Sequence, residues 1–160
     1  MLWLKTFFGI LFQTGLLGIF LYLPALTLNW PEALLFLCIH FSITILASCY
    51  LLIRKPESIQ ARLNYDSKAQ PKEDKLATTL MFSAIIFGLC LAPIDIFHFN
   101  LSPSFEGMAK NIGLCIYIFG LFLFMAAMNS NEFAETTVNI QEERGQKVID
   151  TGIYSLVRHP

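Results

Sequence analysis

The run ALLFLCIHFSITILASCYLLI, residues 33–53, contains no Asp, Glu, Lys or Arg and is long enough to cross a bilayer. A membrane-spanning helix needs about 20 consecutive, mostly apolar residues. Three further runs meet the same requirement, at residues 6–28, 76–97 and 112–128. We therefore expect an all-α membrane protein whose four transmembrane helices lie within residues 1–128.

The composition of the whole chain also indicates a membrane protein. Of the 160 residues, 55% are hydrophobic and 14% are charged, whereas roughly a quarter are charged in a typical soluble domain. The net charge of −1 says nothing about acidic or basic partners, because positive and negative charges nearly cancel. We expect no nucleic-acid partner. The first run is too long for the apolar part of a signal peptide, and no small-residue cleavage site follows it.

Lysine and arginine residues are distributed unequally between the two sides that four spans define. One side has Lys5, the basic loop at 54–75 and the segment 129–160, whereas the other side has only Lys110. Basic residues concentrate in the cytoplasmic loops of membrane proteins. We therefore expect a multi-pass protein with its N-terminus and C-terminal segment in the cytosol, in the inner membrane of a bacterium or the endoplasmic reticulum of a eukaryote.

The loop sequence RKPESIQARL, residues 54–63, has an amphipathic helical pattern. Ile59 and Leu63 fall on one face, basic residues surround it, and Pro56 suits a helix start. We expect a short helix that lies on the anionic inner leaflet.

Prolines mark the ends of several expected helices. Trp30 and Pro31 form a tight connection between the first two spans, and Pro31 suits a first helical position because its missing N–H needs no partner there. Pro24 and Pro93 lie late in their spans, where proline kinks or ends a helix.

Few polar side chains fall inside the spans. No Asp, Glu, Lys or Arg lies near the middle of any span, which disfavours a small proton-coupled transporter. We expect His40 to be neutral and bonded to a helix carbonyl or a serine, and Asp95 and His98 to form a polar surface pair. We expect no metal site and no disulfide, and we interpret all four cysteines as small buried hydrophobic residues: Cys38, Cys49, Cys90 and Cys115.

The segment 129–160 is the most polar part of the chain. We expect the fourth helix to continue past Asn129 for a turn or two, followed by short extended pieces that fold back, with a turn at Gly145. Its many donors and acceptors suit either a solvated tail or a site for a cofactor with an adenosine and a zwitterionic end. The residue pattern alone leaves these two interpretations open.

The run IQEERGQKVIDTGIYSLVRHP, residues 140–160, resembles the signature of the isoprenylcysteine carboxyl methyltransferase family, integral-membrane enzymes that are related to the phospholipid methyltransferases. Asn129, Phe133 and the loop RKPESIQARL also fit that family. One departure is Gln146, at a position where histidine is common.

The resemblance implies binding of S-adenosylmethionine (SAM) on the cytosolic side and methyl transfer to a lipophilic acceptor from the bilayer, such as an isoprenylcysteine carboxylate. Matched residue by residue, it places the cofactor contacts on Gln141, Gln146, Lys147, Val148, Ile149, Tyr154, His159 and Pro160.

The resemblance also implies that the acceptor-side Arg and Glu residues of the family lie beyond Pro160. We therefore expect a truncated or fragment form that binds SAM weakly, and the catalytic residues stay unassigned. The alternative is a non-catalytic four-helix membrane protein or an inactive remnant of the family. No GxxxG motif is present, so the sequence indicates no particular oligomeric state.

Overall fold

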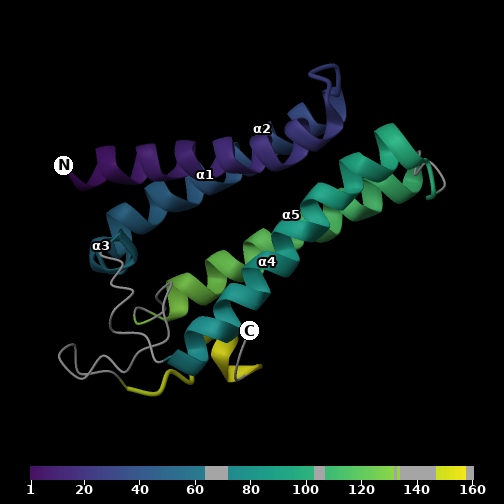
Figure 1. Ribbon diagram of the computed structural model, residues 1–160. Coiled ribbons are helices and arrows are strands. Elements are labelled where there is room, and N and C mark those ends of the chain that lie inside the picture. Colours follow the sequence, from purple (N-terminus) through teal and green to yellow (C-terminus); the bar gives the residue numbers. More distant parts are fainter. Residues whose placement is uncertain (64–71, 103–106, 132, 134–146, 158–160) are drawn as a thin grey trace.

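The computed structural model describes residues 1–63, 72–102, 107–131, 133 and 147–157 (Figure 1). These residues form helices and connecting turns, and no strand occurs among them. The four long helices are α1 (Leu2–Ala25), α2 (Pro31–Arg54), α4 (Lys72–Ile94) and α5 (Met108–Ser130). The short ones are α3 (Pro56–Leu63), the π-helical turn η1 (Asp95–Phe99) and the 3₁₀ turn η3 (Gly152–Ser155).

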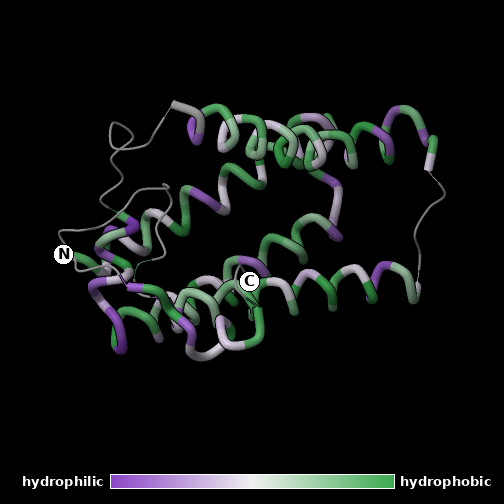
Figure 2. Tube along the Cα trace, turned by 90° about the horizontal axis from the view of Figure 1, so that it is seen from below, coloured by the Kyte–Doolittle hydropathy of each residue, from purple (hydrophilic) through white to green (hydrophobic). Residues whose placement is uncertain are grey.

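Four helices are long and apolar enough to cross a membrane, which confirms the expected number of spans. They are Leu2–Ala25, Pro31–Arg54, Met108–Ser130 and the continuous α4–η1 helix Asp74–Phe99. In the last of these, only 6% of the apolar window is buried inside the protein. Such exposed apolar surface suits a bilayer, where lipid is as apolar as the side chains that it covers. Figure 2 shows that hydrophobic residues dominate all four helices.

The long helices pack in the order α4, α1, α2, α5. Seen from below, α4 and α5 lie on opposite sides of the α1–α2 pair, although they overlap in the view of Figure 1 (Figure 2). Helices α1 and α2 are in contact at Gly18, where an added Cβ would lie at an ordinary van der Waals distance of 3.5 Å from Cδ1 of Leu37.

The bundle has two distinct ends (Figure 1). One end holds the N-terminus, α3, the end of α5 and η3, and we call it the α3 end. The other end holds the connection between α1 and α2 together with η1, and we call it the Trp30 end. Because the number of long helices is even, both ends of the described chain lie at the α3 end.

A small buried core lies at the α3 end. Leu51 and Leu52 of α2, Ile59 of α3 and Met128 of α5 pack together, and Leu51 is only 1% exposed. The short helix that we expected in the loop is present as α3, Pro56–Leu63. Its apolar residue Ile59 is buried against protein, which fixes α3 between α2 and the end of α5.

An aromatic cluster closes the Trp30 end. The Tyr22 hydroxyl donates to the carbonyl oxygen of Trp30 at 3.0 Å, and the Trp30 ring lies 5.2 Å from that of Phe97 in an edge-to-face arrangement. These contacts hold the α1–α2 turn against η1.

Both late prolines lie at changes in helix geometry, as expected. Helix α1 ends one residue after Pro24, and α4 passes into the wider turn η1 two residues after Pro93. Proline has no N–H to donate to the carbonyl four residues earlier, and its ring crowds that carbonyl, so proline kinks or ends a helix.

The expected pair of Asp95 and His98 is wrong, because each side chain bonds to backbone. The Asp95 carboxylate accepts from the N–H groups of Leu101 at 2.6 Å and Ser102 at 3.1 Å. Nε2 of His98 lies 2.8 Å from the Pro24 carbonyl oxygen. Unpaired backbone groups at helix ends need such partners.

The interpretation of the four cysteines as buried is also wrong. All four are free thiols, but Cys38 and Cys115 are exposed, and Cys49 and Cys90 are half-buried. The reason is that apolar side chains of a spanning helix can face lipid rather than protein.

Candidate functional site

The candidate site is built on the end of α5. The helix stops at Ser130, and Asn131 has an extended backbone with φ −115°. The Asn131 carboxamide oxygen accepts from the N–H of Phe133 at 2.9 Å. This local side-chain bond competes with helix continuation. The expected extension of the helix beyond Asn129 for a turn or two is therefore wrong.

The segment 147–157, which carries part of the sequence motif, docks on this helix end. Residues 147–150 have no regular secondary structure, and Gly152–Ser155 form one turn of 3₁₀ helix, where we had expected an extended piece. Within this turn the N–H of Tyr154 donates to the Thr151 carbonyl, and the Ser155 hydroxyl donates to the Gly152 carbonyl at 2.7 Å.

Two contacts hold the segment in place. Gly152 has φ +62°, and a Cβ built on it would collide with Oγ of Ser130 and lie 3.1 Å from Cβ of Ser130. Glycine allows both this left-handed backbone and the close approach. Nδ2 of Asn131 donates to the Tyr154 hydroxyl at 3.3 Å. The motif segment is therefore attached to the end of a spanning helix.

A third contact ties the α2–α3 junction to the same place. The ammonium group of Lys55 donates to the carbonyl oxygen of Asn129 at 2.5 Å. The last carbonyls of a helix lack intrahelical partners and carry partial negative charge, so a lysine suits this position. The end of α5 thus joins α2, α3 and η3.

The structure places four of the eight predicted cofactor residues. Tyr154 and Ile149 are half-buried, whereas Lys147 and Val148 are exposed, with Val148 93% exposed. The other four lie outside the described residues: Gln141, Gln146, His159 and Pro160.

Sequence reasoning missed three residues that shape the site. Lys55 had been counted only as a basic loop residue, and no role had been given to Ser130 or Asn131. Their contacts depend on how helices pack, for which the sequence carried no signal.

The hydrogen-bond partner of His40 also differs from the expected one. Nδ1 of His40 lies 2.6 Å from the hydroxyl oxygen of Tyr117 on α5, so the prediction of a helix carbonyl or a serine as its partner is wrong.

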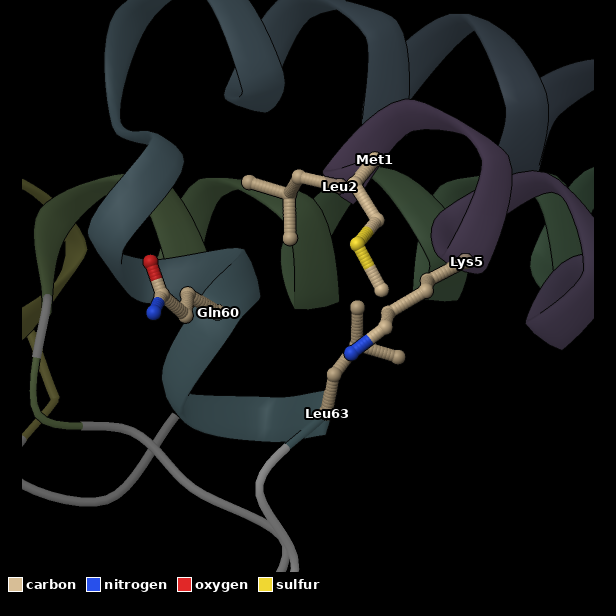
Figure 3. Close-up of a pocket in the computed structure, with 5 residues that line it drawn as sticks. All are labelled: Met1, Leu2, Lys5, Gln60 and Leu63. Carbon is tan, nitrogen blue, oxygen red and sulfur yellow. The ribbon is translucent and has the colours of Figure 1, made fainter.

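Two cavities lined by described residues lie on α1, α2 and α3. One of about 220 Å³ lies between the start of α1 and α3, with Lys5 and Gln60 among its lining residues (Figure 3). It is smaller than typical ligand pockets of roughly 300–1,000 Å³. A second, mostly apolar cavity of about 410 Å³ lies between α1 and α2, beside Ile10 and Ser48. Among the described residues, no three His, Cys, Asp or Glu side chains are grouped as metal ligands.

No family model, curated protein or solved structure matches the chain. A functional hypothesis for this protein therefore depends on its sequence motif and on the geometry of the site.

Proposed function

We propose that the protein is a membrane SAM-dependent methyltransferase that acts on a lipophilic acceptor of the isoprenylcysteine carboxylate type. The observation that carries the proposal is the docking of Gly152 and Tyr154 against Ser130 and Asn131. This docking holds part of the motif at the end of a spanning helix. A water-soluble donor and an acceptor dissolved in the bilayer can meet at such a position.

The charge distribution supports a cytosolic position for this site. Lys5, Arg54, Lys55 and Arg62 lie on elements of the α3 end, and Lys147 begins the docked segment. At the Trp30 end, Lys110 is paired with Glu32, with 3.7 Å between Nζ and Oε1. The positive-inside rule then assigns the α3 end to the cytosol.

The described residues fit a ligand that has hydroxyl and amino-acid groups. The Tyr154 hydroxyl accepts a bond from Asn131, and its own proton is available for donation to a ligand. Val148 is exposed, and its backbone N–H and carbonyl can offer hydrogen bonds to a ligand. SAM supplies an electrophilic methyl group when bound. The task of the chain is to hold donor and acceptor in line, because methyl transfer depends chiefly on positioning.

The alternative is a membrane protein that performs no chemistry. The docking itself also suits this alternative, because Gly152 and Tyr154 contact Ser130 and Asn131 without any ligand. In that case the motif segment would serve only to close the end of α5.

Binding of tritiated SAM to the protein, expressed from its natural reading frame and purified in detergent micelles, tests the proposal. Removing the hydroxyl in Tyr154→Phe should weaken binding by about three- to tenfold, the effect of one hydrogen bond. The matched control Tyr50→Phe changes a 51% exposed tyrosine of α2 and should bind as the wild type does.

Transfer of the label to a prenylated cysteine analogue separates the two functions. Labelled product supports the enzyme. SAM binding without transfer to any lipophilic acceptor would support the non-catalytic alternative, and a failure of the wild type to bind SAM would overturn the proposal.

A further inference from the structure

A third cavity, of about 310 Å³, lies between α2 and α5 at the Trp30 end. Glu32, Lys110 and Asn111 line its end nearest the starts of the two helices, which we call the mouth, and Tyr117 lines the end farther along α5, which we call the floor. Lys110 and Tyr117 are seven residues apart on α5, which corresponds to about 10 Å along the helix axis. The starts of α2 and α5, whose residues line this cavity, lie at the opposite end of the bundle from the docked segment (Figure 1).

The mouth presents two opposite charges side by side. Nζ of Lys110 lies 3.7 Å from Oε1 of Glu32, and each side chain is 52% exposed. An exposed pair of this kind is weak. Both charged groups therefore keep the capacity to bind complementary charges of a ligand.

The walls and the floor are apolar. Leu35, Phe36 and Leu114 line the cavity, and the ring of Tyr117 lies 4.7 Å from that of Phe36. The Tyr117 hydroxyl is already bonded to His40, so the floor requires no polar group from a ligand. Gly113 lines the same cavity, and a Cβ added there would meet no atom within 4 Å. The space beside Gly113 is thus open to a hydrocarbon chain.

We propose that this cavity binds one zwitterionic phospholipid with a primary-amine headgroup, of the phosphatidylethanolamine class. Its ammonium group lies at Glu32, its phosphate at Lys110 and Asn111, and an acyl chain follows Phe36 toward Tyr117. In a bilayer the chain moves from one apolar environment to another, so its burial supplies little selectivity. Selectivity therefore comes from the charge complementarity at the mouth, where an anionic lipid without an amine would occupy Lys110 with its phosphate and leave the Glu32 carboxylate without a cationic partner.

Native mass spectrometry of the protein in mild detergent tests this site. The protein is titrated with equal amounts of phosphatidylethanolamine and phosphatidylglycerol that carry the same acyl chains. The wild type should retain one phosphatidylethanolamine in preference to phosphatidylglycerol. Gly113→Leu fills the cavity and should lose that bound lipid. The matched control Gly120→Leu, on the same helix and outside the cavity lining, also has no atom within 4 Å of an added Cβ and should retain the lipid.

Charge variants provide a second measurement that does not alter the helix packing. Glu32→Gln should lower the preference for phosphatidylethanolamine over phosphatidylglycerol by about threefold, the effect of one exposed ion pair. Lys110→Gln should weaken the retention of both lipids. Circular dichroism and gel filtration establish whether each variant is folded. If Gly113→Leu does not fold, the charge variants alone test the lipid site. An unchanged lipid preference in Glu32→Gln, or full retention by a folded Gly113→Leu, would overturn the proposal.

Discussion

Gly152 lies so close to Ser130 that any side chain at position 152 would meet both side-chain heavy atoms of the serine. The same glycine has φ +62°, a backbone conformation that is unfavourable for other residues. Glycine is therefore required at position 152 for two independent reasons. The contact joins the docked segment 147–157 to the end of α5, and it offers a direct way to test whether that attachment matters.

Gly152→Ala should loosen the docked segment. The left-handed backbone alone costs roughly 1–2 kcal/mol for a residue with a Cβ, and the collision with Ser130 adds to this cost. Hydrogen–deuterium exchange should therefore become faster at the N–H groups of Tyr154, Leu156 and Val157, which are bonded within the turn. In the proposed function, SAM binding should weaken in parallel.

Two controls separate the causes of this effect. Adding Ser130→Gly to Gly152→Ala removes the collision but leaves the backbone cost, so exchange should recover only in part. Gly120→Ala places a methyl group on α5 where no atom lies within 4 Å, and it should leave exchange in 153–157 unchanged. Wild-type exchange in Gly152→Ala would show that the segment is not held by this contact.

Lys55→Met should weaken the joint between the α2–α3 junction and α5. The substitution keeps an unbranched side chain but removes the bond to the Asn129 carbonyl and the favourable charge at the helix end. Interactions of this kind contribute about 0.3–1 kcal/mol. The loss should appear as a lower midpoint of thermal unfolding in detergent.

The neighbouring residue gives the matched control for Lys55. Arg54 is an exposed cation at the end of α2, so Arg54→Met removes the same charge without removing the bond to Asn129. Equal losses of stability in the two variants would argue against a specific role for the Lys55 bond.

The parts of the fold that were predictable depend on local sequence. The four apolar runs, Pro31 at the start of α2 and the short helix after Lys55 all follow from residues that lie within a few positions of one another. A spanning helix makes its backbone hydrogen bonds within its own segment, so one continuous stretch of sequence is enough to predict its position.

The parts that were not predictable depend on packing between distant segments. His40 and Tyr117 are 77 positions apart, and Lys55 and Asn129 are 74 positions apart. Both pairs depend on α2 lying beside α5. The hydrophobic pattern does not reveal such neighbours, because each spanning helix is apolar on nearly every side. The stop of α5 at Ser130 was missed for a local reason, since the Asn131 side chain takes over the N–H of Phe133.

Leu51→Ala should produce the largest loss of stability among single truncations of α2. Leu51 is 1% exposed and packs in the core at the α3 end with Ile59 and Met128. Removing a buried leucine side chain costs about 2–5 kcal/mol, because the cavity that remains is only partly filled by relaxation. Leu46→Ala on the same helix is the control, since Leu46 is 71% exposed. Unfolding by increasing fractions of denaturing detergent measures both, and similar losses would contradict the assignment of the core.

The bond between His40 and Tyr117 should stabilise the bundle in a way that only a double-mutant cycle can show. Tyr117→Phe removes the hydroxyl and leaves Nδ1 of His40 buried without its partner, while Nε2 already has none among the described residues. Interhelical hydrogen bonds in membranes contribute about 0.6 kcal/mol on average and up to roughly 1.7 kcal/mol, and an orphaned buried group adds its own cost. The double variant His40→Phe/Tyr117→Phe removes both polar groups, so it should be less destabilised than the sum of the two single variants. Strictly additive losses in detergent unfolding would mean that the two side chains are not coupled, and Tyr50→Phe should show no loss because that tyrosine is exposed.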